Sequence, residues 1–105
     1  DAKRKVFVNF SPAGIWPNCH VRVEIEVFRT ETIDLENIIL LAEAPFVNGT
    51  IDARTDSCEI ISDKIYSIIA NNYPNRNINI TVSSDNDSGV TINYNITKPY
   101  QQLAI

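Results

Sequence analysis

Strict alternation of apolar and polar residues in three stretches of the chain most limits how it can fold. Residues 20–28, 77–83 and 90–97 place an apolar side chain at every second position. These side chains are Val21, Val23, Ile25, Val27, Ile78, Ile80, Val82, Val90, Ile92, Tyr94 and Ile96. Because successive side chains of a strand point to opposite faces, the pattern predicts strands with one buried and one hydrated face. Residues 5–10 form a shorter run of the same kind.

Two helical patterns lie between the strand predicted at residues 20–28 and the strand predicted at residues 77–83. Asp34 is a plausible N-cap for the first helix, whose apolar run ends near Ala44 and Pro45. Asp56-Ser57 offers an N-cap for the second helix, and Pro74 ends it. The apolar residues of the second helix recur at helical spacing: Cys58, Ile61, Ile65, Ile68 and Ile69.

The order of these elements predicts an α+β fold. A four-stranded antiparallel sheet would carry both helices on its apolar face, in the order strand–strand–helix–helix–strand–strand. The 105 residues are enough for one domain with one core, so residues 1–105 are predicted to form a single domain. The two cysteines, Cys19 and Cys58, are expected to be buried thiols and not a disulfide.

Composition excludes two classes of partner. The net charge of −4 argues against a nucleic-acid binder, which would need a basic surface. No apolar run approaches the roughly 18 residues needed to cross a bilayer, so no membrane association is expected. The chain shows no signal peptide and begins with Asp1 where a methionine would be usual. We therefore expect a cytoplasmic protein, while secretion stays open.

The predicted hydrated face of the last two strands consists of short uncharged side chains. They are Asn77, Asn79, Thr81, Ser83, Thr91, Asn93, Asn95 and Thr97. Such residues suit a crowded, hydrated surface such as the lumen of a barrel, and the alternative is an open α+β sandwich with a plain solvent-exposed face. A lone four-stranded sheet also has two unpaired edges, which favour pairing with other subunits. We therefore expect a homo-oligomer, either a trimer or a hexamer of two stacked trimers.

Four short motifs, in the same order and at similar spacing, resemble the 6-pyruvoyl- and 6-carboxy-tetrahydropterin synthases. Residues 10–13, F-S-P-A, resemble that family's F-S-A-A opening, and residues 19–27, C-H-V-R-V-E-I-E-V, resemble its H-G-H-N-Y-x-V-E-V-E-V strand. Residues 33–35, I-D-L, and 88–91, S-G-V-T, resemble its V-x-D-F and S-G-A-T segments. The resemblance runs from Val6 to about Ile96. It implies the tunnelling fold, an oligomeric barrel and a pocket between subunits.

The residues that hold zinc in that family differ in this chain. The family uses three histidines, and the matching positions read Gly14, Pro17 and Cys19. His20 is the only histidine, and it points to the opposite face of an extended chain from Cys19, so the two cannot easily share a metal. We therefore expect no metal site and no cofactor.

The resemblance places few acid–base groups in the implied pocket. The family's Asp-His proton-handling pair reads Glu43 and Ala44, and its catalytic cysteine lies near Cys19 without being equivalent to it. His20 has no acid at a fixed spacing, so both a structural role and a ligand contact stay open for it. The candidate catalytic residues are thus His20, Glu43 and Cys19.

The family's pterin-binding glutamate corresponds to Ser84, with Asp85 one residue later. A carboxylate can accept two parallel hydrogen bonds from a cyclic amidine, so Asp85 is either a ligand contact or a solvated turn residue. The predicted ligand-binding set is Cys19, His20, Ser84 and Asp85.

Two functions of different classes follow. The first is a divergent, zinc-independent relative of the tetrahydropterin synthases that binds or transforms a small biosynthetic intermediate, such as a heterocycle, between subunits. If it is an enzyme, the resemblance implies a lyase or cyclase activity other than that of an ordinary tetrahydropterin synthase. The second is a non-catalytic oligomeric scaffold or partner subunit that retains only the assembly.

Overall fold

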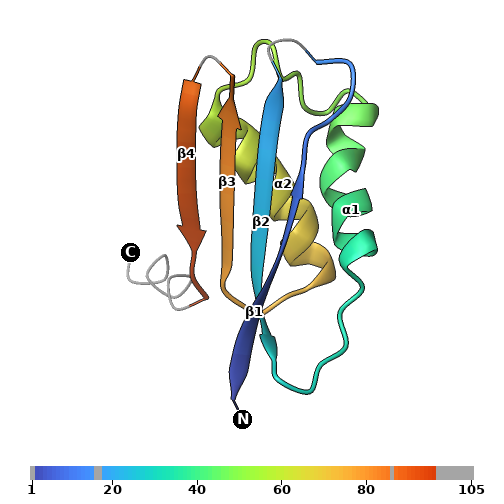
Figure 1. The fold of residues 1–105 in the computed structure, drawn as a ribbon, viewed down its shortest axis with the longest axis vertical. Helices are drawn as coiled ribbons and strands as arrows, with labels where there is room; N and C mark the ends of the chain where they lie inside the picture. The colour runs from blue at the N-terminus through green and yellow to red at the C-terminus, as the bar shows by residue number, and fades with distance from the viewer. Residues whose placement is uncertain (1, 16–17, 86, 97–105) are drawn as a thin grey trace, which may run out of the picture.

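A computed structural model describes residues 2–15, 18–85 and 87–96. The elements along the chain are β1 (Lys3–Phe10), β2 (Cys19–Phe28), α1 (Leu35–Val47), α2 (Cys58–Asn72), β3 (Ile78–Ser84) and β4 (Asp87–Tyr94). The strands form one antiparallel sheet in the order β1-β2-β3-β4, and both helices cover the same face of it (Figure 1). The predicted α+β class, with a four-stranded antiparallel sheet and two helices, is confirmed.

The core lies between the sheet and the helices. Alternate residues of β2 and β3 are at most 2% exposed: Val21, Val23, Ile25, Val27, Ile78, Ile80 and Val82. The helices cover them with Ile38, Ala42, Ile61, Ile65 and Ile69. The predicted assignment of sheet faces is therefore confirmed for these strands. Each fully buried valine or isoleucine contributes about 1.5–3 kcal/mol of transfer free energy, so this layer is the main source of stability.

The helix starts are capped as expected, but the end of α1 differs from the prediction. The side chains of Asp34 and Ser57 accept hydrogen bonds from backbone amides in the first turns of α1 and α2. The expectation that α1 ends near Pro45 is wrong, because the helix continues to Val47. A proline inside a helix removes one hydrogen bond and crowds the carbonyl group four residues earlier, but here the next turn still closes through the Asn48 N–H and the Ala44 carbonyl oxygen at 2.9 Å.

The limits of the two edge strands also differ from the prediction. β1 begins at Lys3, two residues earlier than expected, and its residues pair with residues 21–28 of β2. β4 spans Asp87–Tyr94, whereas the alternating pattern extended to residue 97. Asn95 and Ile96 follow the strand, and Thr97 lies outside the described residues.

A β-bulge interrupts the pairing of β3 with β4. Val90 and Asp87 pair with β3 residues that are only two positions apart, so Ser88 and Gly89 together face the single residue Ser83. Gly89 has φ = 77°, the left-handed value that glycine adopts in bulges of this type. Bulges bend the strand and increase its twist, and this one lies next to the turn that carries Asp85.

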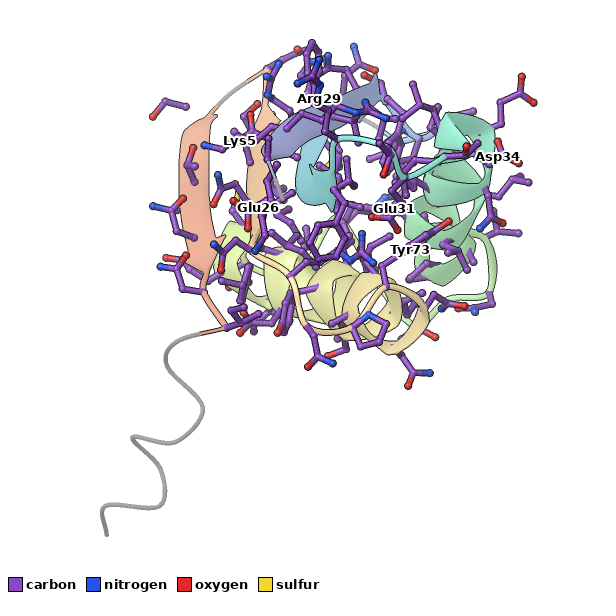
Figure 2. The ribbon with its side chains drawn as sticks, turned by 90° about the horizontal axis from the view of Figure 1, so that it is seen from below. Lys5, Glu26, Arg29, Glu31, Asp34 and Tyr73 are labelled. Atoms are coloured by element: carbon purple, nitrogen blue, oxygen red, sulfur yellow. The ribbon has the colours of Figure 1, made fainter. Side chains whose placement is uncertain are left out.

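An ion pair lies at the opposite end of the molecule. Arg76 Nη1 donates to both carboxylate oxygens of Glu31, at 3.0 and 3.1 Å, and Figure 2 views Glu31 at this end. Arg4 donates to the backbone carbonyls of Arg29 and Glu31. The hydrogen bond from Arg76 is the main cause that lowers the pKa of Glu31. Within the described part of the chain, no helix has the length and apolarity needed to cross a membrane.

Candidate functional site

Three side chains from distant parts of the sequence form a hydrogen-bonded row at one end of the sheet. Ser11 follows β1, His20 is near the start of β2, and Asp85 follows β3. Ser11 Oγ lies 2.8 Å from His20 Nδ1, and His20 Nε2 lies 2.8 Å from Asp85 Oδ1. The antiparallel order explains this meeting, because β1 and β3 end where β2 begins (Figure 1).

Asn18 holds Asp85 in place through two hydrogen bonds. Its side-chain Nδ2 donates to Asp85 Oδ2 at 2.8 Å, and its carbonyl oxygen accepts from the Asp85 backbone N–H at 3.1 Å. Both carboxylate oxygens of Asp85 therefore have partners. The hydrogen bond from His20, followed by that from Asn18, lowers the pKa of the Asp85 carboxyl, which is ionised at neutral pH.

The charge of Asp85 decides which imidazole nitrogen carries the proton. An ionised carboxylate only accepts hydrogen bonds, so His20 Nε2 must donate to it. In the neutral imidazole the other nitrogen, Nδ1, then has a lone pair, and the Ser11 hydroxyl donates to it. The row is thus arranged as hydroxyl, base and orienting carboxylate, the order used to activate a hydroxyl group.

A hollow of about 420 Å³ lies beside the row on the helix-free face of the sheet. Its walls are Asn9, Phe10, Ser11, His20, Val21, Arg22, Thr81 and Ser83. This volume lies in the range of small-molecule sites. The side chain of His20 is 47% exposed and that of Asp85 is 40% exposed, so in a single chain the row is open to water.

Arg22 supplies the positive charge in this hollow. Its guanidinium carbon lies 3.9 Å from the centre of the Phe7 ring, and its Nη2 lies 3.6 Å from Glu24 Oε1. The stacking on Phe7 restricts the guanidinium to the sheet surface. The hollow therefore combines a hydroxyl–imidazole pair with a fixed cation, and its other walls are both polar (Asn9, Thr81, Ser83) and apolar (Phe10, Val21).

The four predicted ligand-binding residues fall into two pairs on opposite faces of the sheet. His20 and Asp85 are hydrogen-bonded on the helix-free face. Cys19 and Ser84 are register partners and line a separate hollow of about 460 Å³, together with Cys58. Cys19 is 4% exposed, and burial, then the nearby Cys58, raises the pKa of its thiol. Cys19 is thus a neutral thiol at pH 7, and no disulfide joins the two cysteines.

The remaining predicted residues lie away from the row. Glu43 is half-buried in α1, on the helix side of the sheet, so the sheet separates it from the exposed face of His20. Of the positions that match the family's zinc ligands, Gly14 lies in the loop after β1 and Pro17 lies outside the described residues. Among residues 2–15, 18–85 and 87–96, no group of three His, Cys, Asp or Glu side chains is arranged to hold a metal ion.

Sequence reasoning missed Ser11 and Asn18 and underrated His20. The expectation that His20 lacks an acidic neighbour is wrong, because Asp85 lies 65 residues away in sequence and 2.8 Å away in space. The signal was present in the predicted strand pattern. Once β2 pairs with β3, His20 lies opposite Ser83, and the alternation of faces places Asp85 on the same side two residues later.

Comparisons of this chain with protein-family models, with curated proteins and with solved structures found no match. The resemblance to tetrahydropterin synthases stays a prediction, and the function is inferred from the chemistry of the site.

Proposed function

We propose that this chain is a zinc-independent relative of the tetrahydropterin synthases that binds and transforms a small molecule at the Ser11–His20–Asp85 row. The observation that carries the proposal is the unbroken hydrogen-bonded row beside a hollow of about 420 Å³. The imidazole has a defined tautomer, an ionised partner and a hydroxyl within reach, which are the requirements for acid–base work.

The role of Asp85 in this proposal differs from the one that the resemblance implies. Both of its carboxylate oxygens already accept hydrogen bonds, one from His20 and one from Asn18. A ligand with a cyclic amidine edge would have to compete with these two donors. We therefore assign Asp85 to orienting His20, and the ligand to the hollow bordered by Arg22 and Thr81.

A ring of subunits would complete the site. β1 and β4 are the edge strands of the sheet, and a head-to-tail contact between them in neighbouring subunits closes a barrel. The helix-free face would then line a hydrated lumen, in which Glu24 and Glu26 accept hydrogen bonds from Asn79 and Asn77. Because the lining of the hollow beside His20 includes Asn9 and Phe10 of β1, side chains of a strand paired to that edge would border it.

The second candidate is a non-catalytic oligomeric scaffold or partner subunit. It is favoured by two large apolar side chains on the outer surface of α1, Leu40 at 66% and Val47 at 86% exposed. They are seven residues apart and share one helix face, which suits contact with another protein.

A ligand screen separates the two candidates. Thermal unfolding would be followed with a panel of pterins, purines and related heterocycles, for the wild type, His20→Ala and the control Glu43→Gln. A ligand present at 100 times its Kd stabilises a protein by about 2.7 kcal/mol, which raises Tm by several degrees. We expect the rise in the wild type and Glu43→Gln and its loss in His20→Ala. Tight self-association with no ligand in the panel would support the scaffold instead.

The ordinary reaction of the family is not expected. The matching positions lack the three histidines that hold zinc and the imidazole of the proton-handling pair. Purified protein should therefore not convert dihydroneopterin triphosphate, with or without added zinc. Turnover at an enzymatic rate, lost on chelation, would show that the alignment of the zinc positions is wrong.

A further inference from the structure

We infer that Ser11 is a nucleophile and that the site transfers or hydrolyses acyl groups of esters or thioesters through a covalent intermediate on Ser11. This inference rests on the proposed function, since the same hollow would hold the substrate. It goes further by naming the reacting atom and the class of substrate.

The geometry meets three conditions for an activated serine. Ser11 Oγ lies 2.8 Å from the basic nitrogen His20 Nδ1, and His20 Nε2 lies 2.8 Å from Oδ1 of the ionised Asp85. Asn18 fixes that carboxylate by donating a hydrogen bond to Oδ2. An unactivated surface serine needs none of these partners, because water satisfies its hydroxyl. The chain has one histidine, and it is bonded to this serine.

The two imidazole nitrogens have exchanged roles relative to those in the serine proteases. In those enzymes Nε2 faces the serine and Nδ1 faces the carboxylate. Here Nδ1 faces Ser11, and Nε2 faces Asp85. Either nitrogen can accept the proton once the carboxylate holds the other N–H, so the exchange leaves the chemistry available.

The proposed reaction balances without a cofactor. Ser11 Oγ attacks the carbonyl carbon while its proton moves to His20 Nδ1, and the carbonyl π electrons move to oxygen. Collapse of this intermediate expels the alcohol or thiol, which takes the proton from Nδ1 and leaves an ester on Ser11. Water, deprotonated by the same nitrogen, then attacks that ester, releases the acid and restores the hydroxyl.

Arg22 narrows the substrate class. It is the cationic side chain among the residues that line the hollow, and it stacks on Phe7 at 3.9 Å. A guanidinium in the wall of the hollow favours an anionic acyl group, although its Nη2 also lies 3.6 Å from Glu24 Oε1. We therefore expect esters or thioesters that carry a carboxylate to react faster than neutral ones of the same size.

Cys19 does not compete for this role. It lies on the other face of the sheet at 4% exposure, and burial raises the pKa of its thiol. Ser83 also lines the hollow, and its position opposite His20 in the strand register makes it the natural second serine to examine.

The test is covalent labelling of the full chain with a fluorophosphonate probe, read by intact mass and peptide mapping. We expect one adduct per chain, located on Ser11, that is absent in Ser11→Ala. The rate should fall at least about 100-fold in His20→Ala, and it should also fall strongly in Asp85→Asn, because the amide keeps the shape of the side chain and lacks the charge that fixes the tautomer of His20. Ser67→Ala is the matched control, because Ser67 Oγ bonds the Asp63 carbonyl in α2, on the far side of the sheet.

The outcomes distinguish this inference from the proposed function. An adduct on Ser83, no adduct at all, or labelling that His20→Ala leaves unchanged would overturn the nucleophile assignment. If ligand binding in the heterocycle screen still depends on His20, the proposed function stands without it. If neither labelling nor binding depends on His20, both fail. Circular dichroism of each variant shows that the fold is intact, which we expect because Ser11 and His20 are exposed.

Discussion

Replacing Gly89 with alanine should open the end of the sheet that carries the site. Gly89 has φ = 77°, and a Cβ built on it would lie 1.8 Å from the Val82 carbonyl oxygen and 2.6 Å from Ser83 Cα. Both are backbone atoms of β3, so no side-chain rotation relieves the clash. The strands must separate by roughly 1 Å, which is more than the spread of about 0.5 Å in hydrogen-bond length.

The expected cost has two parts. A left-handed conformation costs a non-glycine residue about 1–2 kcal/mol. Loss of one or two ladder hydrogen bonds adds about 0.5–1.5 kcal/mol each. The total, about 1.5–5 kcal/mol, is a large share of the 5–15 kcal/mol typical of a whole domain.

Gly49→Ala is the matched control, because both glycines have a positive φ but only Gly89 lacks room for a Cβ. Gly49 has φ = 84°, and no atom lies within 4 Å of its built Cβ. It should therefore lose only the conformational part, about 1–2 kcal/mol. Urea unfolding followed by circular dichroism measures both variants, and the labelling rate of Ser11 should fall only in Gly89→Ala. Equal destabilisation of the two variants would refute the close approach of Gly89 to the backbone of Val82 and Ser83.

Three further outcomes are expected. Ile80→Asp should abolish folding, because Ile80 is 0% exposed and the new charge would be buried without a partner. Thr81→Asp, on the helix-free face, should leave the circular dichroism spectrum intact and reduce the fraction of oligomer measured by light scattering. Similar behaviour of the two variants would contradict the assignment of the two sheet faces. The lowered pKa values of Glu31 and Asp85 mean that stability is retained above the ordinary carboxyl values and lost as pH falls below about 4. A urea midpoint that rises on acidification would contradict this. Burial, then the hydrogen bond to Asp63, raises the pKa of Tyr94 to about 12, so stability should fall as pH rises from about 10 to about 12. Absorbance at 295 nm should show one late-titrating tyrosine that Tyr94→Phe removes.

The sheet and its two faces could be predicted because burial in a strand follows the same period of two as the side chains. β2 and β3 alternate without a break in the sequence, and their alternate residues are buried in the structure. The helix starts were visible for a related reason, since Asp34 and Ser57 each supply an acceptor for otherwise unpaired amides. The end of α1 is harder to predict, because a proline usually ends a helix by removing a hydrogen bond and crowding the preceding turn, whereas α1 continues past Pro45 to Val47.

The site could be predicted only in part, because its contacts join residues far apart in sequence. His20 meets Ser11 across 9 residues and Asp85 across 65. The family resemblance assigns two pairs of sequence neighbours, Cys19 with His20 and Ser84 with Asp85, to one ligand site. Neighbours in a strand point to opposite faces, so that grouping joins two separate hollows. Strand register, not local sequence, decides which of these side chains can act together.

Water is the remaining obstacle to chemistry at the row, and assembly is the means by which this fold could remove it. With His20 at 47% and Asp85 at 40% exposure, solvent weakens the attraction between imidazolium and carboxylate in a single chain. The hollow reaches β1, whose outer edge is unpaired in the single chain. A neighbouring strand on that edge would exclude water and strengthen every interaction in the row. Disrupting the oligomer with Thr91→Asp should therefore also slow the labelling of Ser11, because Thr91 lies on β4 opposite Thr81 and outside the residues that line the hollow. Unchanged labelling in a monomeric Thr91→Asp variant would show that the single chain holds the complete site.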